Sequence, residues 1–202
     1  MKESLYESGV ECMLCKKHFK TKKSKSKIYQ LKGINRELRN TYDLPHINFE
    51  PFYYQVHVCE HCGFTFNEKF SPYFIPKLKD DLILLLSKSW KTRSFNMERT
   101  PEKALEIYKL AYLMATRKNE TAYITASLVL KIAWIYDDLN DEANALKYRQ
   151  LAYDYYSKSY QNGDYEKYNQ SVHFLDYILG TLAYKLGDIQ KALYFFYCSC
   201  ER

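Results

Sequence analysis

From Lys77 onward, hydrophobic residues recur at the three- and four-residue intervals that place them on one face of a helix. Polar and glycine-containing breaks divide this pattern, and we expect helices at 77–91, 101–117, 120–138, 141–160, 165–186 and 188–199. Thr100 before Pro101 is typical of a helix start, and Gly187-Asp188 is typical of a tight turn between helices. The pattern therefore predicts an entirely helical region.

Residues 1–76 follow a different pattern, with short β-prone runs and four of the five prolines. The runs at 28–31 and 52–58 predict strands, and in the second run Tyr54, Val56 and Val58 alternate with residues expected to face solvent. We therefore predict an α+β fold, mainly α. It consists of a small β-rich module at 1–76 followed by an antiparallel helical domain at 77–202.

The helical region contains small residues at repeating positions. Gly180, Gly187, Ala192 and Phe196 are spaced as in the tetratricopeptide repeat, where small residues let the two helices of a hairpin approach closely. An earlier and looser unit contains Ala133. The spacing predicts a tetratricopeptide-like repeat domain with helices longer than the standard ones.

Four of the six cysteines form two CxxC pairs, Cys12 with Cys15 and Cys59 with Cys62. Two such knuckles supply the four thiolates of a tetrahedral zinc site, and four protein ligands leave no open position for water. We therefore predict one structural Zn²⁺ ion in a zinc-ribbon-like module. The alternatives are buried cysteines without metal, or a redox pair, which lacks its usual βαβ context.

The formal net charge is +6, and residues 16–27 hold seven lysines and no acidic residue. Lys22, Lys23 and Lys25 are the candidate contacts to nucleic acid phosphates. A solvated lysine-rich strand is the alternative interpretation.

Motifs for other chemistry are missing from the sequence. The six glycines form neither GxxxxGK[ST] nor GxGxxG, and there is no GxSxG or HExxH motif, so we expect no catalytic activity. Cys198 and Cys200, near the C-terminus, are expected to be thiols on a helix face, and metal binding or oxidation of this pair is the alternative. The first ten residues do not resemble a signal peptide, and the longest apolar run, Leu82–Leu86, is too short to span a membrane. These features predict a cytoplasmic protein that does not enter a membrane.

The layout resembles a bacterial family of unknown function that combines an N-terminal double-CxxC module with a tetratricopeptide-like helical domain. Met13 and Glu60 stand where proline is common in that family. The matching residues are Cys12-x-x-Cys15 with Phe19, Cys59-x-x-Cys62-Gly63-Phe64, Arg99-Thr100-Pro101 before Ala104, Ala133-Trp134-Ile135-Tyr136, Leu179-Gly180 and Leu186-Gly187-Asp188. The resemblance implies the fold and the metal but no activity.

These patterns predict a zinc-binding protein-interaction module that acts as a scaffold or adaptor. The repeats would take up a protein or peptide on a concave wall formed by the first helix of each pair. By analogy, that wall includes Trp134, Tyr177, Thr181 and Tyr184, although packing between repeats explains these residues equally well. The alternative function is nucleic-acid binding through the basic zinc module. The sequence leaves the oligomeric state open.

Overall fold

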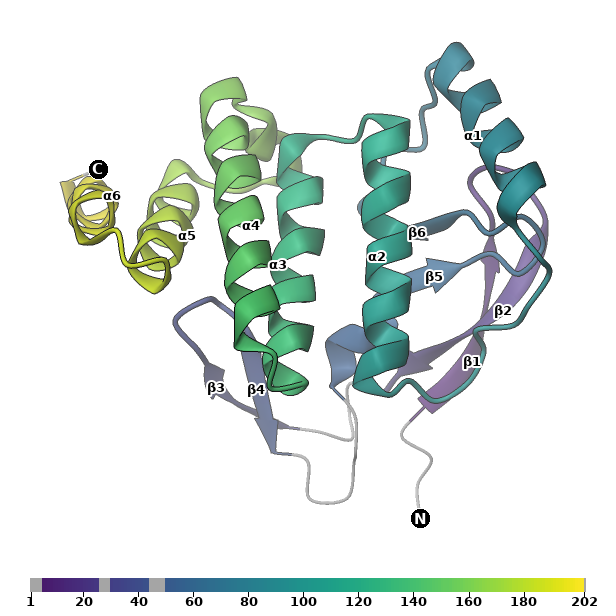
Figure 1. Ribbon diagram of the computed structural model, residues 1–202, viewed down its shortest axis with the longest axis horizontal. Coiled ribbons are helices and arrows are strands. Elements are labelled where there is room, and N and C mark those ends of the chain that lie inside the picture. The colour runs from purple at the N-terminus through teal and green to yellow at the C-terminus, as the bar shows by residue number, and fades with distance from the viewer. Residues whose placement is uncertain (1–4, 26–29, 44–49, 202) are drawn as a thin grey trace. The chain divides into compact units, whose positions relative to one another are not determined.

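Short strands come first along the chain and long helices follow them (Figure 1). The structure is a computed structural model that describes residues 5–25, 30–43 and 50–201. Within these residues, three two-stranded sheets precede six α-helices. The predicted α+β fold, mainly α, is confirmed.

The chain divides into two compact units, each built from two segments. Unit 1 comprises Met1–Gln30 and Asp43–Glu120, and unit 2 comprises Leu31–Tyr42 and Thr121–Arg202. These bounds differ from the predicted division into 1–76 and 77–202. The first two helices group with the outer strand pairs, and the central strand pair groups with the last four helices.

Unit 1 contains two antiparallel hairpins that have the same local design. In the first hairpin, Val10 of one strand lies opposite Phe19 of the other, and in the second hairpin His57 lies opposite Phe66. The elements of unit 1 are β1 (Leu5–Glu11), β2 (His18–Ser24), the 3-10 helix η2 (Pro51–Tyr54), β5 (Val56–Val58), β6 (Thr65–Asn67), α1 (Pro76–Ser89) and α2 (Pro101–Lys118). Phe64 stacks on Phe66, and its ring also meets the edge of Phe70, so aromatic packing forms the centre of this unit.

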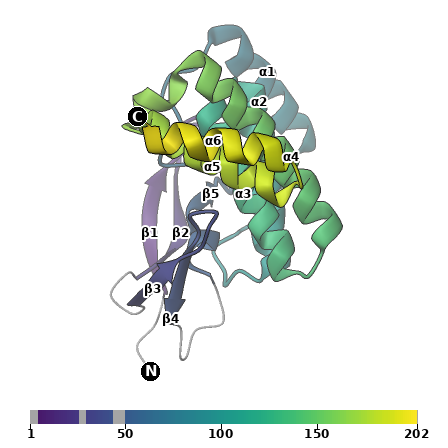
Figure 2. The same ribbon diagram turned by 90° about the vertical axis from the view of Figure 1, so that its left-hand side faces the viewer.

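Unit 2 is a run of helices in which each helix packs against the next, and the α5–α6 pair crosses the α3–α4 pair (Figure 2). Its elements are β3 (Gln30–Ile34), β4 (Asn40–Asp43), α3 (Ala122–Asp138), α4 (Glu142–Asn162), the 3-10 helix η3 (Asp164–Tyr168), α5 (Val172–Lys185) and α6 (Ile189–Glu201). Side chains that are fully inaccessible to solvent, such as Leu128, Ile132 and Leu179, form its core. Buried aromatic side chains, such as Tyr123 and Tyr156, complete this core.

Side-chain hydrogen bonds cap the first turns of α2 and α4. Thr100 accepts a hydrogen bond from the Lys103 N–H at 3.3 Å, as predicted, and Asp141 caps α4 in the same way. Gly187, with φ of 84°, makes the predicted turn between α5 and α6. A Cβ atom at Gly180 would lie 2.8 Å from the Phe196 ring, so the absence of a side chain lets these two helices approach closely.

Two predicted elements are wrong. The helix expected at 165–186 is broken, because Asn169 adopts a left-handed conformation and Ser171 then caps a new helix, α5. The strand expected at 52–58 begins as the 3-10 helix η2, with Pro51 in its first turn, and only Val56–Val58 is a strand. Tyr53 and His57, expected on an exposed face, are both buried. Of the predicted strand at 28–31, residues 28 and 29 lie outside the described residues.

None of the helices in the described part of the chain combines the length and the apolar character needed to cross a membrane.

Candidate metal centre

The two predicted knuckles lie at the ends of the two hairpins of unit 1. Cys12 and Cys15 lie in the turn between β1 and β2, and Cys59 and Cys62 lie in the turn between β5 and β6. Each turn thus presents two sulfur atoms, and the hairpin strands hold it in place.

The two turns share the same backbone hydrogen bonds. In the first turn, the Cys12 N–H donates to the Lys17 carbonyl at 3.0 Å, and the Lys16 N–H donates to the Cys12 carbonyl at 3.0 Å. In the second turn, the Cys59 N–H donates to the Phe64 carbonyl at 3.0 Å, and the Gly63 N–H donates to the Cys59 carbonyl at 2.8 Å. Lys16 and Gly63 both have positive φ values, 62° and 77°. The two knuckles are therefore local copies of one turn, as expected for the two halves of a single site.

The four sulfur atoms form one cluster and all lie within 4.8 Å of one another. Cys12 Sγ lies 3.6 Å from Cys62 Sγ, and Cys15 Sγ lies 3.7 Å from Cys59 Sγ. A zinc ion held tetrahedrally at about 2.3 Å from each sulfur separates the sulfurs by about 3.8 Å. The donor set and its spacing fit a metal ion bound by four thiolates.

The close approach of the sulfurs also changes their acidity. Hydrogen bonds from Cys12 and Cys62 lower the pKa of Cys59 to about 2. The hydrogen bond with Cys59 raises the pKa of Cys12 to about 12, and hydrogen bonds with Cys12 and Cys59 raise the pKa of Cys62. A bound cation favours all four thiolates and must displace protons to bind.

A tryptophan from unit 1 packs directly on the second knuckle. The Trp90 indole N–H donates to the Glu60 carbonyl at 2.9 Å, and a Cβ atom at Gly63 would lie only 2.4 Å from the Trp90 ring. Two features therefore require glycine at position 63: the positive φ and the close contact with the indole ring. The sequence indicated Gly63, but it gave no signal for Trp90.

A family model described as "uncharacterized protein conserved in bacteria (DUF2225)" matches residues 5–200, which include both knuckles and α1 to α5. The chain belongs to this family. No curated protein and no solved structure matches it. The predicted resemblance to a bacterial family of unknown function is thus confirmed.

The histidines near the knuckles of this DUF2225 protein lie outside the cysteine cluster. The buried His57 ring meets the edge of Phe66, and burial lowers the pKa of His57 to about 4. His61 Nε2 lies 3.0 Å from the carbonyl oxygen of His18. Cysteine alone therefore makes up the donor cluster found among the described residues.

Arg99 connects the segment before α2 to the strand that leads to Cys59. Its guanidinium is buried, and Nη1 donates to the carbonyls of Tyr53 and Val56, the latter at 2.9 Å. Its backbone N–H donates to the hydroxyl of Tyr54 at 2.8 Å, and burial lowers the pKa of Arg99 to about 10. Arg99 thus holds η2 and β5 in place through their main chain.

Acidic neighbours partly neutralise the predicted nucleic-acid patch. Lys22 lies opposite Glu7 in the strand register, and Lys23 Nζ contacts Glu68 at 2.7 Å. Lys20 also reaches Glu7 at 3.2 Å, and a hydrogen bond from Asn96 together with this ammonium lowers the pKa of Glu7. Lys25 follows the end of β2, and position 27 lies outside the described residues. Neighbouring carboxylates therefore offset part of the positive charge that the lysines of this strand contribute.

The four residues of the predicted partner groove differ in exposure. Trp134 on α3 is 8% exposed and Thr181 on α5 is 3% exposed, whereas Tyr184 is 50% exposed. Tyr177 is half-buried and packs against Phe196. These four side chains do not form an exposed wall.

The chain's own hairpin covers Trp134. The Trp134 indole N–H donates to Glu37 at 3.1 Å, and Arg39 Nη1 donates to the Trp134 carbonyl at 3.3 Å. Both Glu37 and Arg39 lie in the segment between β3 and β4. A position predicted to bind a partner is thus occupied within unit 2.

A buried ion-pair network fastens this hairpin. Glu37, 3% exposed, accepts from Arg149 Nε at 2.6 Å and Nη2 at 2.9 Å, and Asp137 accepts from Arg149 Nη1 at 3.0 Å. Burial lowers the pKa of Arg149, but hydrogen bonds to Glu37 and Asp137 raise it overall. Arg39 pairs with Asp138 at 2.9 Å. The network joins residues 112 positions apart, which no local sequence pattern could indicate.

Proposed function

We propose that the four-cysteine cluster binds one zinc ion that holds the two hairpins of unit 1 together. The observation that supports this most strongly is the spacing of the four sulfurs, which matches the edges of a tetrahedral zinc–thiolate site. Strands β5 and β6 have three residues each, and such short pairs are unstable without further support. The zinc role is structural, because four protein ligands leave no place for a reacting water.

Metal analysis of the purified protein tests this proposal. We expect one zinc ion per chain, and we expect none in a Cys59→Ser variant. Cys198→Ser is the matched control, since Cys198 lies outside the cluster. A wild-type chain that contains no zinc, or one that keeps zinc after the Cys59 change, would contradict the proposed site.

We further propose that unit 2 is a protein-interaction scaffold and that α6 provides its contact surface. Along this helix, Ile189, Leu193 and Tyr197 recur every four residues and are 49%, 65% and 60% exposed, and Tyr194 beside them is 61% exposed. We call these four residues the α6 face. Contiguous exposed apolar residues of this kind mark interaction sites. Figure 2 shows α6 as the yellow helix at the end of unit 2.

The chemistry of the α6 face indicates the kind of partner. The segment 189–200 contains one charged residue, Lys191, and its ammonium is paired with Asp188 at 2.8 Å. A partner that buries this surface must therefore offer apolar side chains and little charge. An amphipathic helix or strand of another protein meets that requirement.

Partner capture with matched variants tests this role. The full-length protein should retain a defined protein from an extract of its source bacterium at both low and high salt. Leu193→Glu should abolish retention. Leu84→Glu is the control, because Leu84 is similarly exposed, at 54%, but lies on α1 in unit 1. Equal loss in both variants would contradict a role for the α6 face.

The same experiment addresses nucleic-acid binding, the second function predicted from the sequence. Retention that requires intact nucleic acid, falls steeply with salt and disappears when Lys22, Lys23 and Lys25 become glutamate would favour that function instead. The pairing of Lys23 with Glu68 and the position of Glu7 opposite Lys22 give it less support than the α6 face gives the scaffold role.

A further inference from the structure

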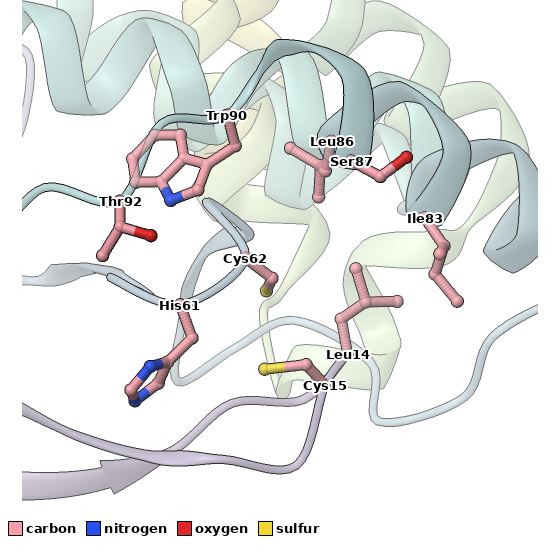
Figure 3. Close-up of a pocket in the computed structure, with 9 residues that line it drawn as sticks. All are labelled: Leu14, Cys15, His61, Cys62, Ile83, Leu86, Ser87, Trp90 and Thr92. Carbon is pink, nitrogen blue, oxygen red and sulfur yellow. The ribbon is translucent and has the colours of Figure 1, made fainter.

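The four cysteines differ in their access to solvent. Cys12 and Cys59 have no exposed surface, whereas Cys15 and Cys62 are half-buried. Cys15 and Cys62 both line a pocket of about 360 Å³ on the surface of unit 1 (Figure 3). One cysteine of each knuckle is therefore accessible to a small molecule, and the other is shielded.

The pocket has an apolar wall beside the sulfurs. Leu14, Leu86 and Trp90 lie around the two cysteines, with Ile83 further along α1 (Figure 3). The polar groups of the lining are His61, Ser87 and Thr92. A pocket of this composition suits a small, mostly apolar molecule with one polar end.

Each accessible sulfur also has a shielded sulfur beside it on the other knuckle. Cys62 Sγ lies 3.6 Å from Cys12 Sγ, and Cys15 Sγ lies 3.7 Å from Cys59 Sγ. Only a short movement would bring either pair to the bonding distance of a disulfide, about 2.05 Å. A reagent that simply alkylates one thiolate would make no use of this second sulfur, whereas a two-electron oxidant uses both.

We propose that the pocket admits a small organic hydroperoxide, which oxidises Cys15 or Cys62 and links it to its shielded partner on the other knuckle, so that the metal is released. The inference rests on the proposed zinc site and adds an oxidant-sensing role to it.

The reaction balances in two steps. The accessible thiolate attacks the terminal peroxide oxygen, an S–O bond forms, the O–O bond breaks, and the alkoxide takes a proton from water to leave as the alcohol. The shielded thiolate then attacks the sulfenic acid, an S–S bond forms, the S–O bond breaks and hydroxide leaves. One hydroperoxide is reduced and two thiolates are oxidised. The cluster thereby loses two of its four ligands and its hold on the ion.

The experiment uses the full chain carrying Cys198→Ser and Cys200→Ser, because these two other thiols would otherwise react as well. Metal content is measured first, and this reading alone tests the proposed zinc site. Cumene hydroperoxide or hydrogen peroxide is then added, zinc release is followed with a chromogenic chelator, and disulfides are mapped by mass spectrometry without reduction.

We expect cumene hydroperoxide to act faster than hydrogen peroxide and to produce a Cys12–Cys62 or Cys15–Cys59 disulfide. Ser87→Trp, which fills the pocket, should slow the reaction several-fold. Lys88→Trp is the matched control, since Lys88 is the next residue on α1 and does not line the pocket. Equal rates for the two oxidants, an unchanged rate in Ser87→Trp, or a disulfide within one knuckle would overturn the proposal. If the chain contains no zinc, disulfide mapping still tests the reactivity of the pocket.

Discussion

Different kinds of polar contact stabilise the interior of each unit of this protein. In unit 1, buried side chains bind main-chain carbonyls: Tyr108 donates to Phe52 at 2.7 Å, and Lys118 Nζ donates to Ser71 at 2.7 Å. In unit 2, the buried ion pair of Glu37 and Arg149 joins residues 112 positions apart, whereas the buried Lys118–Glu120 pair of unit 1 is local.

The difference follows from the amount of regular structure in each unit. Short hairpins and loops leave many backbone groups without partners inside an element, so unit 1 uses buried side chains to satisfy its main chain, and the proposed zinc ion would hold its hairpins. The helices of unit 2 pair their own backbone groups, which leaves its buried polar side chains to fasten the inserted hairpin. We therefore expect the stability of each unit to depend on a different contact.

Metal removal should produce the largest difference between the units. Structural zinc sites contribute about 10–16 kcal/mol in small zinc-finger peptides, which is comparable to or exceeds the total stability of a typical domain, roughly 5–15 kcal/mol. A strong chelator should therefore unfold the hairpins of unit 1 and leave α3 to α6 folded. Hydrogen exchange read by mass spectrometry checks this peptide by peptide. Persistent protection of residues 5–25 and 56–67 after complete metal loss would contradict a structural ion.

Removing the carboxylate of Glu37 should produce the largest effect in unit 2. Glu37→Ala leaves the Arg149 guanidinium buried beside Asp137 alone, and breaking a buried ion pair typically costs about 3–5 kcal/mol. Urea unfolding measures this cost. Glu142→Ala is the control, because Glu142 is an exposed residue of the same unit.

The paired change Glu37→Leu with Arg149→Met tests the origin of this loss. It separates the contribution of the ion pair itself from the cost of leaving one buried charge without its partner. Apolar residues of similar size can replace a buried ion pair at little cost. The double variant should therefore be more stable than either single change, whereas additive losses would show that the two side chains act independently.

The sequence was informative where the signal is local. Cys12 and Cys15 lie on one turn, so their spacing alone indicated the cluster, and the three- and four-residue periodicity placed five of the six helices close to their observed bounds. The sequence failed where partners are distant. The contact of Trp90 with Gly63 and the ion pair of Glu37 with Arg149 depend on the complete fold. The helix break at Asn169 depends on a left-handed backbone conformation that hydrophobic periodicity cannot show.

The next prediction concerns the contact between the second knuckle and Trp90. Gly63→Ala combines a positive φ, which costs about 1–2 kcal/mol, with a clash against the indole of about 1–3 kcal/mol. Gly163→Ala is the matched control in unit 2, since Gly163 has φ of 68° but an added Cβ would meet nothing within 4 Å. We expect Gly63→Ala to lower the free energy of unfolding of its unit by the larger amount. Equal losses in denaturant unfolding would show that Trp90 does not restrict position 63.

The smallest effect is expected at Gly180, where two opposing contributions nearly cancel. Alanine is favoured over glycine inside a helix by about 1 kcal/mol, whereas overpacking costs about 1–3 kcal/mol. An added Cβ would lie 2.8 Å from the Phe196 ring and 3.3 Å from the Ala192 carbonyl oxygen. Phe196 is half-buried and can give way, but the carbonyl belongs to the α6 backbone, so we expect a net loss below about 1 kcal/mol. In a Phe196→Leu background the loss should shrink, because only the backbone contact remains. Thermal unfolding of the wild type, the two single variants and the double variant measures this coupling, and a clear stabilisation by Gly180→Ala alone would show that close packing of α5 on α6 does not require glycine.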